Sequence, residues 1–175
     1  MINLKQEFEK AVPIEVYKTY LGEQRALHDL HYKRAEISAD ALPENLPPLR
    51  ILIITEPWCG DSTAIVPVLQ KLFEGRDVVM RVAFRDENPE LMDQFLTNGG
   101  RSIPVILILD EQGRLRMRFG PRPQKAQAVF EQYKPLFEEG KMERKEISKK
   151  IRAFYSKDRG RAIVEEFTTK LASVL

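Results

Sequence analysis

The chain has 175 residues, of which 43% are hydrophobic and 31% are charged, a composition typical of a globular protein of one domain. Its 28 basic and 26 acidic residues leave a formal net charge of +2 at pH 7. A balance this close to neutrality excludes a strong whole-molecule attraction to nucleic acid or to an anionic membrane, so any basic site must be local.

The longest apolar runs, residues 51–54 and 105–109, are much shorter than a bilayer span. The N-terminus, M-I-N-L-K-Q-E-F-E-K, lacks the apolar stretch of a secretory signal. Cys59 is the single cysteine, which excludes an internal disulfide framework. We therefore expect a cytoplasmic protein.

The first third of the chain is expected to be a helical extension followed by a linker. Apolar side chains recur at roughly helical spacing over residues 3–34, and Pro13 fits the first turn of a second helix. The segment A-L-P-E-N-L-P-P, residues 41–48, has too many prolines for a helix and predicts a linker.

The middle of the chain alternates between strand and helix patterns. The apolar run R-I-L-I-I-T, residues 50–55, predicts a buried strand, and the apolar spacing over 62–73 predicts a helix. Residues 77–85 are rich in β-formers, and 88–96 predict a short helix with Pro89 near its start. These patterns give the order βαβα.

A β-hairpin and three helices are expected to complete the chain. Residues 105–109 and 114–119 predict two strands joined by the turn D-E-Q-G. The helices are expected over residues 124–139, 141–155 and 161–174. Pro135 is expected to kink or end the first of them.

We therefore expect a single domain over residues 1–175, built of three parts. They are an N-terminal helical extension with its linker over residues 1–48, a core over 49–139 and a C-terminal helical extension over 140–175.

Two short signals lie far apart in the sequence. The stretch E-P-W-C-G-D-S-T, residues 56–63, follows the first core strand, and S-I-P, residues 102–104, immediately precedes the third. Together with the order βαβαββα they resemble the thioredoxin family, whose active site combines a W-C-G-x-C turn with a cis proline that faces the thiol. The resemblance covers about residues 49–139 and implies an α/β thioredoxin-like fold, with a central mixed β-sheet flanked by helices.

The resemblance implies a role for four residues. Cys59 matches the nucleophilic thiol, Trp58 the flanking indole, Gly60 the tight turn and Pro104 the cis proline.

Three positions depart from the family pattern. Asp61 stands where thioredoxins usually have proline, Ser62 stands where they have the resolving cysteine, and Ile53 replaces their buried aspartate. The chain therefore cannot perform a dithiol reductase cycle, and the motif resembles a monothiol C-x-x-S variant.

The position of Cys59 also bears on its reactivity independently of the family. A thiol at the start of a helix meets unpaired backbone N–H groups and the positive end of the helix dipole, which favour the thiolate. Ser62 can donate a hydrogen bond to that thiolate, whereas the carboxylate of Asp61 opposes it. We expect an accessible Cys59 with a mildly lowered pKa.

A lone thiol can attack a disulfide but cannot release itself from the adduct. The sequence therefore predicts thiol-disulfide exchange by a monothiol oxidoreductase, in which Cys59 and Ser62 are the catalytic pair. The expected partners are a disulfide-containing protein or small-molecule disulfide as substrate and a low-molecular-weight thiol as resolver. The expected substrate platform consists of Trp58, Gly60, Asp61, Ile103 and Pro104.

The chemistry requires no cofactor. An iron–sulfur cluster shared across a dimer is a minor alternative, because monothiol glutaredoxins carry one. The rival hypothesis is a non-catalytic thioredoxin-fold module that binds a protein or peptide, because a fold does not fix a function.

Three other features of the sequence are more simply explained by a structural role than by a binding site. Arg114, Arg116 and Arg118 share one face of a strand and can bind an anion, but more simply they keep an exposed strand from pairing. His28 and His31 lie three residues apart without further visible ligands, so no metal site is predicted. The basic segment 141–161 is interpreted as a solvated helix face, without a clear nucleic-acid or membrane signal.

Overall fold

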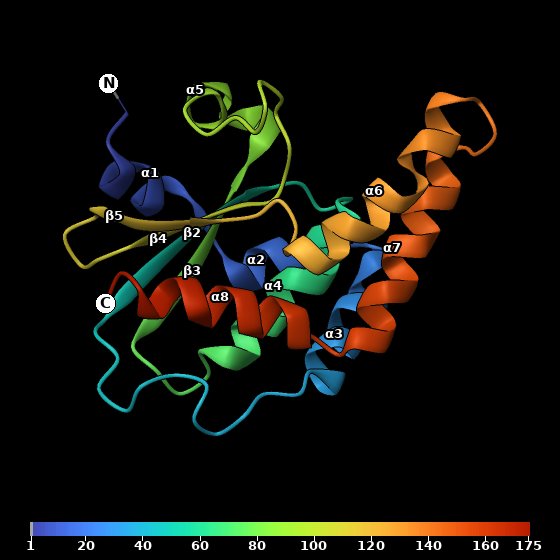
Figure 1. Cartoon of the computed structure of the whole chain (residues 1–175). Helices are drawn as coiled ribbons and strands as arrows, with labels where there is room; N and C mark the ends of the chain where they lie inside the picture. Colours follow the sequence, from blue (N-terminus) through green and yellow to red (C-terminus); the bar gives the residue numbers. More distant parts are fainter. Residues whose placement is uncertain (1) are drawn as a thin grey trace.

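A computed structural model describes residues 2–175 of the chain as a five-stranded sheet flanked by helices (Figure 1). The strands are β1 (Val12–Pro13), β2 (Leu49–Thr55), β3 (Val78–Phe84), β4 (Val105–Leu109) and β5 (Leu115–Phe119). The helices are α1 (Leu4–Lys10), α2 (Ile14–Thr19), α3 (Gln24–Arg34), α4 (Gly60–Leu72), α5 (Pro89–Asp93), α6 (Gln124–Glu138), α7 (Arg144–Asp158) and α8 (Arg161–Ala172), with a 3₁₀ turn η1 (Arg85–Glu87) before α5.

The sheet is mixed, with the strand order β1-β3-β2-β4-β5. Strands β2 and β3 pair in parallel, whereas the other three pairs are antiparallel. Strand β4 is buried along its whole length, as its uninterrupted apolar sequence V-I-L-I-L predicts. The fold class and the hairpin of β4 and β5 are thus confirmed.

Alternate side chains of the central strands enter two different cores, because successive residues of a strand point to opposite faces. On one face, Ile51 and Ile53 pack in the larger cluster with α2, α4, α7 and α8. On the other face, Leu52 and Ile54 pack in a smaller cluster with α1 and α5. Figure 1 shows these two helical layers on either side of the sheet.

The N-terminal extension holds one element that the sequence analysis did not anticipate. Strand β1 lies between α1 and α2 and pairs with β3, with Val12 opposite Val82. Two residues are too few to produce a period-two pattern, so a helical pattern on both sides conceals them. The extension therefore covers an edge of the sheet, which limits unwanted strand pairing.

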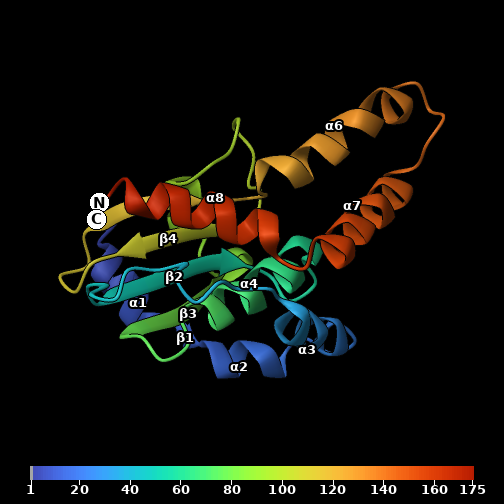
Figure 2. The same ribbon diagram turned by 60° about the horizontal axis from the view of Figure 1, so that its bottom comes forward.

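The C-terminal part forms the three expected helices. Helix α6 continues past Pro135 to Glu138, so this proline does not end it at once. Figure 2 shows α6 and α7 running side by side and projecting beyond the sheet, while α8 returns to lie along it. The C-terminal end of α7 lies near the start of α4, where the Tyr155 hydroxyl donates to Asp61.

Among the residues that the structure describes, no helix is both long and apolar enough to cross a bilayer.

A group of buried polar atoms without hydrogen-bond partners lies where side chains of α2, α3 and α4 meet. It comprises the hydroxyl of Tyr17, both ring nitrogens of His28 and the amide oxygen of Gln70. His28 is almost fully buried, and this burial lowers its pKa to about 4, with Lys18 acting in the same direction. The ring is therefore neutral at pH 7.

Replacing His28 by leucine is expected to make the free energy of unfolding fall less steeply as the pH is lowered. In the folded chain the ring resists protonation down to about pH 4, whereas in the unfolded chain it binds a proton near pH 6.5. The unfolded state binds more protons in this window, so His28 lowers the free energy of unfolding as the pH falls from 6.5 to 4, by about 3 kcal/mol. Urea unfolding at several pH values measures this slope, and an identical slope in His28→Leu contradicts the assignment.

Candidate functional site

The candidate site lies where β2 leads into α4. Cys59 is the N-cap residue of α4, with extended backbone angles φ −72° and ψ 114°. Its N–H donates to the Glu56 carbonyl at 3.1 Å, and its carbonyl accepts the N–H of Thr63 at 3.1 Å. This places the thiol at the first turn of the helix, where backbone N–H groups lack partners within the helix.

The segment before β4 faces this thiol. The Ile103–Pro104 peptide bond is cis, as the S-I-P signal predicts, and the Cys59 Sγ donates to the Ile103 carbonyl at 3.6 Å. A Cβ atom on Gly120 would overlap the Pro104 carbonyl oxygen, and Gly120 has a φ of +109°, so glycine is required there. The loop before α6 thus packs directly against the cis-proline segment.

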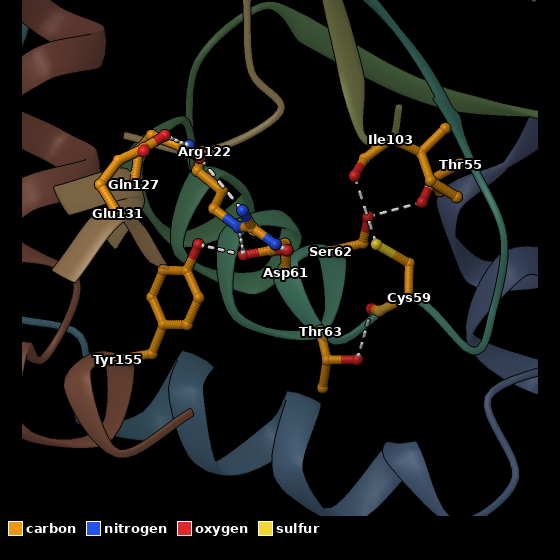
Figure 3. A network of polar contacts seen from close by, with 10 residues as sticks. All are labelled: Thr55, Cys59, Asp61, Ser62, Thr63, Ile103, Arg122, Gln127, Glu131 and Tyr155. Carbon is orange, nitrogen blue, oxygen red and sulfur yellow. Dashed lines mark hydrogen bonds and ion pairs between the residues drawn. The ribbon is translucent and has the colours of Figure 1, made fainter. Parts of the chain in front are cut away.

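Two buried hydroxyl groups lie next to the thiol. The Oγ atoms of Thr55 and Ser62 share a hydrogen bond of 2.5 Å, and both residues are fully buried. Figure 3 shows them beside Cys59 and Ile103. Hydrogen bonding from Ser62 and Thr55 acts to lower the pKa of Cys59.

The expectation of an accessible thiol with a lowered pKa is wrong. Cys59 is only 6% exposed, because it packs in the smaller core cluster with Leu91, Met92 and Ile103. Burial raises the pKa of Cys59, and the nearby Asp61 carboxylate acts in the same direction. Desolvation of the charged form therefore outweighs the helix start and the hydroxyl groups.

Asp61 lies on the other side of the helix start and forms a second polar cluster (Figure 3). Its two carboxylate oxygens accept from the Arg122 Nε at 3.1 Å each, and one of them also accepts from the Tyr155 hydroxyl at 2.6 Å. Burial raises the pKa of Asp61, and its two partners oppose this shift. The carboxylate is held by these two partners and forms no hydrogen bond with the thiol.

Sequence reasoning missed Arg122 and Tyr155, which are 61 and 94 residues away from Asp61. The one available signal was Asp61 itself. A carboxylate in place of the family's proline requires a partner if it is buried.

The other expected platform residues divide into two groups. Trp58 is 60% exposed with Arg85 stacked 5.2 Å from its ring, and Gly60 is exposed beside it. Ile103 and Pro104 are buried. Only Trp58 and Gly60 thus present a free surface next to Cys59.

Arg114, just before β5, and Arg116 and Arg118 within it do not form an anion site. Arg114 pairs with Asp110 at 2.8 Å, and Arg116 donates to the Val174 carbonyl at 2.6 Å. Arg118 donates to the Phe95 carbonyl at 3.0 Å and the Thr97 hydroxyl at 2.9 Å. These guanidinium groups tie the strand to its neighbours.

In the described residues, no three His, Cys, Asp or Glu side chains lie close enough together to hold a metal ion. Ile53, at the position of the family's buried aspartate, is fully buried in an apolar cluster. It offers no group for proton transfer.

The fold and the thiol facing a cis proline define a thioredoxin-like protein. Residues 15–134 match a protein-family model described as Thioredoxin, so the chain belongs to the thioredoxin family.

Two solved structures resemble the whole chain. The crystal structure of an HIV epitope-scaffold aligns with a TM-score of 0.75 and 15% identity, covering 99% of this chain and 100% of that one. The crystal structure of a protein of unknown function from Pseudomonas aeruginosa aligns with a TM-score of 0.69 and 18% identity, covering 100% of both chains. At these identities the likeness shows the fold alone.

Proposed function

We propose that the protein performs thiol-disulfide exchange through Cys59 alone, as a monothiol oxidoreductase. The observation that supports this most directly is the position of the Cys59 Sγ at the start of α4, 3.6 Å from the carbonyl that precedes the cis proline. An extended substrate that pairs with the segment at Ile103 would place its disulfide beside this sulfur.

The proposed reaction begins with loss of the Cys59 proton to solvent. The thiolate then attacks one sulfur of the substrate disulfide, forms a mixed disulfide and releases the second substrate sulfur as a thiolate. The chain has no other cysteine, so an external thiol must attack the mixed disulfide. That step restores Cys59 and leaves a new disulfide between the external thiol and the substrate sulfur.

The contact with Ile103 links deprotonation to substrate binding. The protonated thiol donates to the Ile103 carbonyl, and this donor is lost when the thiolate forms. The carbonyl then becomes free to accept an N–H from the substrate backbone. The exposed indole of Trp58 provides an apolar surface for the substrate next to the sulfur.

The burial of Cys59 makes the thiol slow to react with a disulfide in the absence of bound substrate. Its raised pKa leaves it protonated at neutral pH, and only the thiolate attacks a disulfide. We therefore expect weak reactivity at pH 7 that increases in mild alkali.

The test is adduct formation with a small symmetric disulfide, 2-hydroxyethyl disulfide, followed by intact-mass measurement. At pH 8.5 the native chain is expected to gain one adduct and to lose it when a free thiol is added. Cys59→Ser, with an unchanged circular dichroism spectrum, is expected to gain none. The proposal fails if the native chain stays unmodified at this pH while the urea-unfolded chain reacts.

The burial of Cys59 also favours a second candidate, a non-catalytic binding module. In this case the thiol is a core residue, and the exposed Trp58 belongs to a surface that binds a protein or peptide. An unreactive Cys59 in the folded chain is the result that distinguishes this candidate from exchange chemistry.

A further inference from the structure

A pocket of about 260 Å³, lined by both polar and apolar side chains, lies between α3, the start of α4 and α7. Its lining includes Gly60, Asp61 and Arg122 from the core and His31, Ser148 and Arg152 from the two extensions. Cys59 does not line it, and the sulfur points to the opposite side of the helix start, toward Ile103 (Figure 3). The pocket thus borders the thiol site, with which it shares Trp58, Gly60 and Asp61, but the sulfur lies outside it.

The charges that line the pocket leave one positive group unpaired. The single carboxylate, Asp61, already accepts from Arg122 and from the hydroxyl of Tyr155. The guanidinium of Arg152 remains at the rim, where it forms no ion pair with the described residues. The pocket thus has a net positive charge.

The remaining hydrogen-bonding capacity of the lining consists mostly of donors. Arg122 uses its Nε for Asp61 and its Nη1 for Gln127, which leaves Nη2. Gln24 uses its amide oxygen for Thr63, which leaves its NH₂ group. The N–H groups of Gly60 and Asp61 belong to the first turn of a 13-residue helix, where no intrahelical acceptor exists.

His31 provides an independent sign that the pocket is built for a ligand. Its side chain lines the pocket and is only 8% exposed, yet its ring has no hydrogen-bond partner among residues 2–175. The ring nitrogens are thus left without a protein partner, and a polar group inside the pocket would satisfy them.

We propose that this pocket binds a small oxyanion-bearing molecule, a carboxylate or a phosphate, with Arg152 as its charge partner and the N–H groups at the start of α4 as its donors. The volume suits a small molecule rather than a folded segment of a partner. The proposal can be tested separately from the thiol chemistry, because Cys59 does not line the pocket.

The test is a titration of the full-length protein with inorganic phosphate and, separately, with acetate, followed by amide NMR at constant ionic strength in chloride. Saturable shifts are expected at Gly60 and Asp61 for at least one of the two anions, and the stronger binder identifies the phosphate or carboxylate class. Arg152→Gln is expected to weaken binding roughly tenfold or more, as loss of a charge-assisted hydrogen bond predicts.

The matched control is Lys149→Gln, which removes a positive charge from the exposed surface of the same helix outside the pocket lining. This variant and Cys59→Ser are expected to bind the anion as the native chain does. Shifts that do not saturate, or that weaken equally in Arg152→Gln and Lys149→Gln, overturn the proposal. Retained binding in Cys59→Ser keeps this result separate from the outcome for the thiol.

Discussion

Replacing Arg122 by methionine is expected to lower the free energy of unfolding by about 3 kcal/mol at pH 7. The substitution keeps an apolar stem of similar length beside Phe130 but leaves the Asp61 carboxylate without its ion pair. Removing one partner of a buried pair leaves a charge that is poorly solvated, which is strongly destabilising. The loss is expected at the lower end of the usual range, because Asp61 keeps the hydrogen bond from Tyr155.

The destabilisation is expected to shrink in acid. Without Arg122 the pKa of Asp61 rises further above its ordinary value, so the folded chain takes up a proton more readily than the unfolded chain as the pH falls. The double variant Asp61→Asn/Arg122→Met removes the unpaired carboxylate charge as well, and it is expected to recover most of the stability. Urea unfolding at pH 7 and pH 5 measures both effects.

The matched control is Arg101→Met, which breaks an exposed ion pair with Asp93 at 2.9 Å. It is expected to lower stability by at most about 1 kcal/mol. Equal losses in Arg122→Met and Arg101→Met contradict the anchoring role assigned to the Asp61 cluster.

Replacing Ser62 by cysteine is expected to convert the protein to one that forms an internal disulfide. The Ser62 hydroxyl lies close enough to Cys59 to hydrogen-bond with it and lower its pKa, so a thiol at this position faces the first sulfur. An internal thiol competes far better for a mixed disulfide than a dilute external thiol does. The adduct with 2-hydroxyethyl disulfide is then expected to be transient, ending in an oxidised chain without an adduct.

Intact-mass measurement after oxidation checks this prediction. Ser62→Cys is expected to lose two hydrogens per chain, whereas Ser148→Cys, which places the second thiol on α7, is expected to retain two free thiols or to form dimers. If the Ser62→Cys chain keeps both thiols free after treatment with the oxidant, the two positions do not face each other.

The sequence predicted the parts of the site that depend on local pattern. The strand, turn and helix around Cys59 follow from an apolar run and a helical spacing, and the S-I-P signal predicted the cis Pro104. Strand β1 escaped detection, since two residues carry no periodicity.

The solvation of the thiol could not be predicted in the same way. Cys59 is covered by Leu91, Met92 and Ile103, which come from a short helix and a loop far along the chain. Helix position alone favours a lowered pKa, and only the packing of these distant side chains reverses that direction. The pocket likewise depends on α3 and α7, whose docking no local motif encodes.

The division of the chain at residues 48 and 139, its cytoplasmic location and its exchange partners stay predictions. The expected core begins well after residue 15, where the match to the thioredoxin family model starts. The helices and strand β1 before residue 49 also pack on the same sheet as the rest of the chain.

The rate of reaction of Cys59 with 2-hydroxyethyl disulfide, followed by intact mass from pH 6 to pH 10, tests the account most directly. A thiol that faces the cis-proline segment yet is held protonated by burial predicts a rate that rises about tenfold per pH unit through neutrality and levels off only above the ordinary thiol pKa of about 8.5. A rate that is already at its plateau at pH 7, or a folded chain that does not react at any pH, contradicts it.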